Sequence, residues 1–244
     1  MAASDRAVPA AKRAQEIVAE LKRLSSKKAR DGMARYAIPS DHAFGVPMST
    51  MQQVARRAGH DQELAEALWK TGWYEARTVA AFVAEPEKLT PAQMDRWCRD
   101  FDNWAICDTV CFKLFDRSPH ALKKIAQWAG KRDEYQRRAA FALLASVALH
   151  DRESGDEPFL RLLPVVEKAA SDERNFVKKG VSWALRSVGT RSAKLNAASV
   201  ALSRRLAESD NASARWIGKG AVRELTGPIV RKRLEAKSRA QKRG

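Results

Sequence analysis

The sequence predicts an all-α protein, a right-handed solenoid of stacked helix pairs with a concave basic face. Two observations carry this prediction. Apolar residues recur with helical spacing along almost the whole chain, and no stretch alternates convincingly as a strand would. A segment also recurs about every 40 residues, which indicates a repeat architecture in which each unit stacks on the next.

The expected helices are short and closely connected. An amphipathic helix over 11–25 comes first, and after a loop with Pro39 and Gly45 a second helix starts at Ser49. Pro91 after Thr90 marks a helix start, because threonine caps a helix and proline suits its first position. The remaining expected helices cover residues 61–71, 73–84, 91–100, 103–117, 120–130, 134–150, 157–171, 174–188, 193–208 and 212–225, with C-terminal stops at Gly189 and Gly227.

Three divisions of the chain are expected. Residues 1–8 form a flexible N-terminus, and residues 9–227 form a single repeat domain. The basic tail 228–244 begins helical and is partly disordered at its end.

The repeat is visible in three segments, 136–144, 177–185 and 217–225, which superpose with a HEAT-like period. We expect the small residue in each to allow close helix packing and the leucine to be core. The recurring cation would form a basic stripe along one face, although cations on ordinary solvated helices would give the same pattern. The aligned positions hold a cation (Arg138, Lys179, Lys219), a small residue (Ala139, Gly180, Gly220) and a leucine (Leu144, Leu185, Leu225).

The chain is strongly basic, with a formal net charge of +16. The tail from residue 228 holds seven Lys or Arg residues and one Glu, so it supplies +6 and leaves +10 for the body. Polyanions, nucleic acid first, are the expected partners of such a surface. The alternative is a soluble protein whose lysines are simply solvated.

Cysteine content and hydropathy point to the cytoplasm, with association with the nucleoid when DNA is bound. The three cysteines Cys98, Cys107 and Cys111 are odd in number and lie in apolar surroundings, which suggests reduced thiols. They have no Cys or His partners at zinc-finger spacing, so neither a metal nor a cofactor is expected. No signal peptide and no apolar window near the roughly 18 residues of a membrane span is present. We expect a monomer that does not bind membranes.

One helix carries a carboxylate on an otherwise apolar face. Asp108 lies one turn after Trp104, on the same side. Such an aspartate could be paired to an arginine or could cap a neighbouring helix. Trp183 and Arg186 lie side by side on a later helix, where the tryptophan could simply be core. Two helices that each present a tryptophan beside a charged residue nevertheless make a candidate site.

Four stretches resemble the AlkD-like family of DNA alkylation repair proteins, which are HEAT-like-repeat DNA glycosylases. The resemblance runs in order over residues 33–190, and the repeats extend it to about residue 226. Asn103 and the Ala-Ile-Cys between Trp104 and Asp108 depart from many relatives, so the substrates could differ. The stretches are Met33-Ala-Arg-Tyr36 followed by Gly45-Val46, Asn103-Trp104-Ala-Ile-Cys-Asp108, Gln136-Arg-Arg138, and Val177-Lys-Lys-Gly-Val-Ser-Trp183-Ala-Leu-Arg186.

The resemblance implies specific roles. Asp108 would be the catalytic carboxylate, with Trp104 and Trp183 as aromatic walls beside the lesion nucleotide. Arg138 would grip the DNA backbone, with Arg137 as the rival for that role. By the resemblance, Tyr36 would lie against the damaged strand, and Lys178, Lys179 and Arg186 would contact phosphates. Arg35 and Lys219 are further expected DNA-binding residues.

The expected function is that of a monofunctional glycosylase for positively charged N3- or N7-alkylated purines in double-stranded DNA. A lone carboxylate suits this chemistry, because a cationic base leaves neutral and needs no general acid. The alternative is a non-catalytic HEAT-repeat protein that binds damaged or unusual DNA with the same basic face. A protein-binding solenoid is a third possibility, which predicts little salt-sensitive affinity for DNA.

Overall fold

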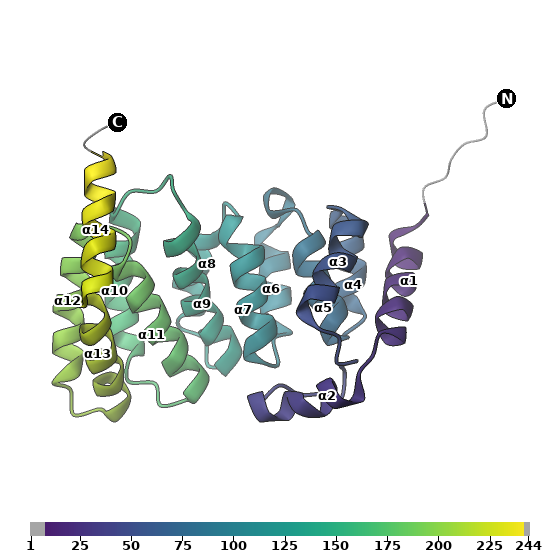
Figure 1. Ribbon diagram of the computed structural model, residues 1–244, viewed down its shortest axis with the longest axis horizontal. Helices are drawn as coiled ribbons and strands as arrows, with labels where there is room; N and C mark the ends of the chain where they lie inside the picture. The colour runs from purple at the N-terminus through teal and green to yellow at the C-terminus, as the bar shows by residue number, and fades with distance from the viewer. Residues whose placement is uncertain (1–7, 242–244) are drawn as a thin grey trace. The chain divides into compact units, whose positions relative to one another are not determined.

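The computed structural model describes residues 8–241, the side chains of residues 238, 240 and 241 excepted, and all the regular secondary structure in that range is helical (Figure 1). The chain divides into two compact units, residues 1–97 and 98–244. Most of the predicted flexible segment 1–8 lies outside the described residues. None of the helices in 8–241 is long and apolar enough to span a bilayer. The predicted boundaries of a single domain over 9–227 stay a prediction.

Unit 1 is built on α5. Helices α3 and α4 both pack against α5, and α1 packs against α4. Leu64, Leu68 and Val79 are fully buried between these helices, and the indoles of Trp69 and Trp97 stack with their centroids 4.1 Å apart. The unit ends within α6. Its helices are α1 (Ala10–Arg23), α2 (Lys27–Met33), α3 (Met48–Ala58), α4 (Gln62–Lys70), α5 (Tyr74–Val83) and α6 (Pro91–Arg99), with a 3-10 turn at Ala34–Tyr36.

A fully buried carboxylate fixes the loop that follows α2. The carboxylate of Glu75 accepts hydrogen bonds from the backbone N–H groups of Phe44, Gly45 and Val46, at 2.7–3.2 Å. Gly45 has a φ of 80°, and a Cβ there would lie 2.4 Å from the carbonyl oxygen of Ser26. Only glycine fits such a close approach in this conformation. The loop is thereby held against the start of α2, the short helix that leads to Arg35 and Tyr36.

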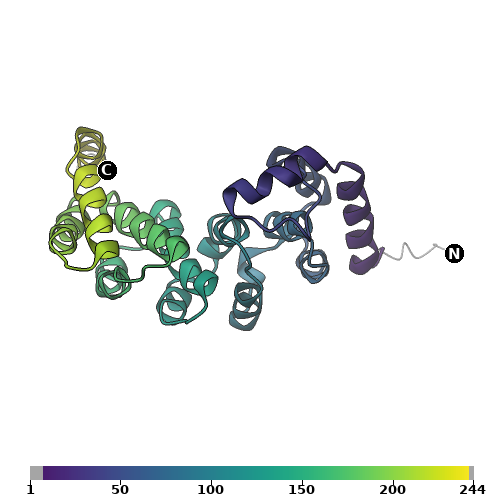
Figure 2. The ribbon, with the colours of Figure 1, turned by 90° about the horizontal axis from the view of Figure 1, so that it is seen from below.

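Unit 2 consists of helix pairs arranged in two rows. Helices α7, α9, α11 and α13 follow one another in one row, and α8, α10 and α12 follow one another in the other. In Figure 2 these pairs succeed each other in chain order up to α13. The bounds are α7 (Trp104–Lys113), α8 (Ala121–Trp128), α9 (Glu134–His150), α10 (Glu157–Ala169), α11 (Asn175–Gly189), α12 (Ala193–Ala207), α13 (Ala212–Leu225) and α14 (Pro228–Gln241), with a 3-10 turn at Phe115–Arg117. The prediction of an all-α protein of HEAT-like helix pairs is confirmed.

Side-chain caps explain where several of these helices begin. Asn103 accepts a hydrogen bond from the N–H of Ile106 at the start of α7, and Asp133 accepts one from Gln136 at the start of α9. Each cap satisfies a backbone donor that has no partner within its own helix. The start of α7 at Trp104 therefore follows from Asn103, and this sets the register of the residues behind it.

The repeat prediction is partly right in its structural detail. Leu144, Leu185 and Leu225 are buried as expected. A Cβ at Gly180 would lie 3.5 Å from the side chains of Arg138 and Phe141, so α11 does pack closely on α9.

Two parts of the repeat prediction are wrong. A Cβ at Gly220 would meet no atom within 4 Å, so this glycine does not allow close packing. Gly218 has that role instead, because a Cβ there would lie 2.2 Å from the backbone nitrogen of Ala207 in α12. Of the three aligned cations, Lys179 and Lys219 are exposed but Arg138 is buried. The three therefore do not form one exposed stripe.

The described part of the basic tail is a helix, and the expected disorder at its end stays a prediction. It forms α14 through Gln241, and the last three residues, which include Lys242 and Arg243, lie outside the described range. Val230 is buried, and Lys237 Nζ donates to the carbonyl oxygens of Thr190 and Arg191, at 3.0 Å each. Burial, together with nearby arginines, lowers the pKa of Lys237. At Lys237 the tail is therefore bound to the end of α11 rather than free in solvent.

Candidate active site

One face of α7 presents three partly exposed residues at a spacing of four. Trp104, Asp108 and Phe112 lie along this face. The opposite face, which includes Ile106 and Val110, is buried, as are Cys107 and Cys111 beside the face that carries Asp108. The side chain of Asp108 is 21% exposed. The carboxylate is therefore at the rim of the core and in contact with solvent, neither sealed in the interior nor freely solvated.

Arg138 of α9 holds this carboxylate with two parallel hydrogen bonds. Its Nε donates to Asp108 Oδ1 at 2.8 Å, and its Nη2 donates to Oδ2 at 2.7 Å. Its Nη1 donates to the carbonyl oxygen of Phe176 in α11 at 2.6 Å. With a side chain only 7% exposed, Arg138 has no free edge for a phosphate. The expectation that Arg138 grips the DNA backbone does not fit this geometry, and pairing of the aspartate to an arginine, the alternative reading, is what the structure shows.

Asp108 and Arg138 form an ion pair at a mostly buried site, and each member affects the pKa of the other. Burial raises the pKa of the Asp108 carboxyl above its ordinary value, and Arg138 opposes this effect. Burial alone would lower the pKa of the Arg138 guanidinium, but the hydrogen bonds and charge of Asp108 more than offset it and the pKa is raised. Arg138 therefore stays protonated and favours an ionised carboxylate. The negative member of the pair is the more exposed of the two.

Aromatic rings extend the site from α7 to α11. The rings of Phe112 and Trp183 stack with centroids 6.4 Å apart and an interplanar angle of 27°. The ring of His150 packs edge-on against Phe112, with centroids 4.3 Å apart. Asp108 lies one turn before Phe112 on α7, so the contact of Phe112 with Trp183 brings α11 to the face of α7 that carries Asp108. Phe112 was missed as a site residue, although its position one turn after Asp108 was the available signal.

The other predicted DNA contacts fall into three groups. Arg137 is paired with Asp172 at 3.0 Å, and Arg186 is paired with Glu224 at 2.6 Å. By contrast, no carboxylate within residues 8–241 forms an ion pair with Lys178, Lys179 or Lys219.

Arg35 and Tyr36 belong to unit 1, whereas the cluster described above belongs to unit 2. Both are exposed on the 3-10 turn after α2, and the side chain of Tyr36 is 67% exposed. No cluster of metal-binding side chains is present within 8–241.

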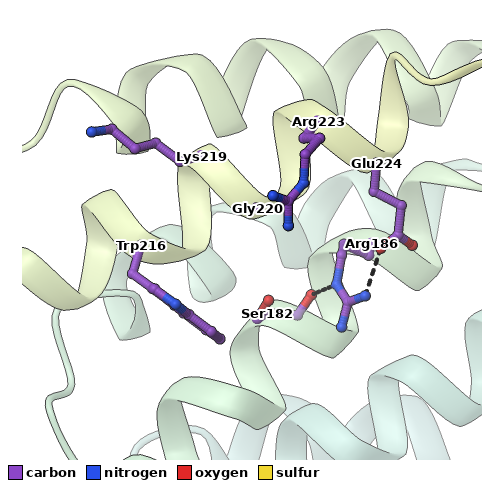
Figure 3. A pocket seen from close by; sticks show the side chains of 7 residues that line it. All are labelled: Ser182, Arg186, Trp216, Lys219, Gly220, Arg223 and Glu224. Carbon is purple, nitrogen blue, oxygen red and sulfur yellow. Dashed lines mark hydrogen bonds and ion pairs between the residues drawn. The ribbon is translucent and has the colours of Figure 1, made fainter.

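A cavity of about 360 Å³ lies between α11 and α13. It is lined by Trp216, Lys219, Gly220, Arg223 and Glu224 of α13 and by Ser182 and Arg186 of α11 (Figure 3). Trp216 was not singled out from the sequence. Its position, directly before the third repeated segment and among basic residues, was the signal that could have found it.

Comparison with known proteins gives a family and a fold. A family model described as "DNA alkylation repair enzyme" matches residues 17–225. A solved structure described as "a new family of proteins related to the HEAT-like repeat DNA glycosylases with affinity for branched DNA structures" is similar with a TM-score of 0.72 at 20% identity, over 90% of this chain and 95% of that chain. A designed armadillo repeat protein aligns with a TM-score of 0.34 at 14% identity, over 73% of this chain and 93% of that chain. No match was found among the curated proteins.

Proposed function

This chain belongs to the DNA alkylation repair enzyme family, and from that premise we propose that it is a monofunctional DNA glycosylase for positively charged N3- or N7-alkylated purines in duplex DNA. The observation that carries the proposal is the Asp108 carboxylate, fixed by Arg138 at the solvent edge of an aromatic cluster.

The reaction needs few groups. An N7- or N3-alkylated purine already carries a positive charge, so the bond from the sugar C1′ to the base can break with its electron pair moving onto the base, which leaves neutral. Water supplies the new bond to C1′ and loses a proton. No general acid is required, unlike sugar hydrolysis with its pair of carboxylates. A single carboxylate is sufficient, because the charge to be stabilised develops on the deoxyribose.

Asp108 suits this role through its position. Its carboxylate can stabilise the positive charge that builds on the sugar, and it can orient or deprotonate the attacking water. A cation that approaches from solvent meets the carboxylate before it meets the guanidinium of Arg138, so the pair attracts it.

Arg138 acts in this proposal as a positioning residue. It occupies both carboxylate oxygens in a planar, bidentate geometry that lysine cannot reproduce. The carboxylate is thereby held in one orientation before the substrate arrives, which lowers the entropic cost of the reaction.

The rings around Asp108 favour the same charge. Trp104 lies one turn before Asp108 on its face of α7, and Phe112 and Trp183 stack one turn after it. The face of each ring attracts a cation by about 0.5–2 kcal/mol, depending on how far the cation is desolvated. The site thus selects a lesion by charge, so neutral lesions should be poor substrates.

Release of free bases from defined duplexes tests the proposal. We expect chromatography to detect 7-methylguanine or 3-methyladenine released from methylated DNA, and little uracil released from a uracil-containing duplex of the same sequence. Heat-inactivated protein controls for spontaneous depurination. Uracil release as fast as that of the methylated bases would contradict selection by charge.

A second candidate function is binding of branched DNA without catalysis. Two observations favour it: Arg138 compensates the charge of Asp108, and the similar solved structure is described as having affinity for branched DNA structures. This candidate predicts no base release by the wild type above the inactivated control. It also predicts that substitution of Asp108 changes only the affinity for DNA.

A further inference from the structure

Trp216 presents an indole to solvent at the end of the helix row. Its side chain is 51% exposed, and with Tyr36 it is one of two aromatic residues in the described range that stand out as exposed. An exposed indole leaves a large apolar surface in water, and burial of that surface would be favourable. Figure 3 shows the ring projecting from α13 toward Ser182 of α11.

The space beside this ring is open. Gly220 lies one turn after Trp216 on α13, and a Cβ at Gly220 would meet no atom within 4 Å. Glycine within a helix is unfavourable relative to alanine, so its lack of a side chain here is a local cost. The result is a cavity of about 360 Å³ with the indole as one wall.

The lining of this cavity has more cations than carboxylates, because Arg186, Lys219 and Arg223 line it with Glu224. Lys219 and Arg223 line it, and neither forms an ion pair with a carboxylate of residues 8–241. Lys178 Nζ lies 5.3 Å from the centroid of the Trp216 ring without lining the cavity. The part of the indole that faces the cavity is therefore not covered by this lysine. Arg186 forms part of the wall, where it is held by Glu224 and by the carbonyl oxygen of Ser182.

The position of Trp216 at the end of the repeat explains why its ring is exposed, whereas the rings at the equivalent positions are partly buried. Tyr135 of α9 and Phe176 of α11 precede the first two repeated segments as Trp216 precedes the third. Those two rings pack on each other with centroids 5.6 Å apart, and both are partly buried. Trp216 is the last residue of this series, and α13 is the last helix of the row.

We propose that the cavity binds an unpaired nucleobase, with the indole of Trp216 stacked on the base and with Lys219 and Arg223 on the flanking phosphates. The ligand class is a single-stranded segment next to a duplex. Stacking on an aromatic ring accepts every base, because each base has a π-face, so the site reads no sequence. A phosphate alone would use the two cations and leave the indole in water. This inference rests on the DNA binding that belongs to the proposed function, but not on base release.

Three DNA ligands test the site. One is a blunt duplex, the second is the same duplex with a short single-stranded overhang, and the third carries an overhang of equal length that lacks bases. Fluorescence anisotropy at a fixed salt concentration gives the three affinities. We expect the wild type to bind the overhang with bases more tightly than either of the other ligands, because only that overhang offers a ring to stack.

Two variants locate the effect. Trp216→Ala should weaken binding of the overhang with bases on the order of tenfold and leave binding of the blunt duplex nearly unchanged. Gly220→Leu fills the cavity without removing a charge, improves helix propensity, and should give the same selective loss. Ile229→Ala, which removes another exposed apolar side chain outside the cavity, is the control and should alter neither affinity.

Equal wild-type affinity for the overhangs with and without bases would overturn the inference, as would a Trp216→Ala protein that keeps the preference. Base release from methylated duplex together with either result would overturn this inference and leave the proposed function standing. A Trp216-dependent preference without any base release would support this inference and contradict the proposed function.

Discussion

Arg138 and Lys219 occupy equivalent positions in the repeat, yet their environments are opposite. Helix α9 packs between α7 and α11, so Arg138 is buried. Its guanidinium donates hydrogen bonds to the carboxylate of Asp108 and to the carbonyl oxygen of Phe176. Helix α13 ends the row, and Lys219 is exposed beside the Trp216 cavity. A repeat thus fixes which positions are equivalent, while the neighbouring helices decide whether a cation stabilises the fold or faces a ligand.

The largest expected difference between the two positions is in stability. Arg138→Ala leaves Asp108 without its partner at a mostly buried site, and removal of one member of such a pair costs about 3–5 kcal/mol. Lys219→Ala removes an exposed side chain and should change stability by no more than about 0.5 kcal/mol. Urea denaturation of both variants measures the contrast. Similar destabilisation by the two substitutions would contradict the different environments of Arg138 and Lys219 in the helix row.

A second contrast uses the two glycines of α13. Gly218→Ala places a Cβ against the backbone of α12 and should destabilise the protein by about 1–3 kcal/mol. Gly220→Ala places one in open space and should stabilise it by about 0.5–1 kcal/mol through helix propensity. Thermal unfolding of the pair shows the sign of each effect. A larger loss of stability in Gly220→Ala than in Gly218→Ala would contradict the assignment of Gly218 as the close-packing glycine.

The smallest expected effect concerns the salt dependence of DNA binding. Each exposed cation that contacts a phosphate adds about 0.9 to the slope of log affinity against log salt. Lys179→Ala and Lys219→Ala should each reduce the slope by about that amount. Arg138→Lys, at a buried position where the cation pairs with Asp108, should leave it unchanged. A reduced slope for Arg138→Lys would indicate that Arg138 contacts a phosphate, against the conclusion drawn from its burial and its bonds to Asp108 and Phe176.

The sequence predicted the helices well where an apolar face had to be buried. It missed α2, which has no buried residue and depends on the cap by Ser26 rather than on periodicity. Which side chains are buried and which are exposed was harder to predict from the sequence. Alignment of Arg138 with Lys179 suggested a shared exposed face, but the helices on either side of α9 could not be read from the repeat.

The candidate site was predicted in composition more than in geometry. The i, i+4 spacing placed Trp104 and Asp108 on one face of α7, as the structure shows. The ion pair of Asp108 with Arg138 joins residues 30 positions apart, and the stacking of Phe112 on Trp183 joins α7 to α11. Contacts of this kind depend on how successive helices pack, which neither the periodicity nor a family motif specifies.

The most direct test of the account is the rate of base release by Asp108→Asn under single-turnover conditions, with methylated duplex DNA bound to saturation. Asparagine keeps nearly the same shape and can still accept a hydrogen bond from Arg138, but it carries no charge. We predict that release of 7-methylguanine collapses while affinity for the duplex is held or improves, because a negative charge near the phosphates is gone. A folded Asp108→Asn protein that releases the base at the wild-type rate would contradict the central role of this carboxylate.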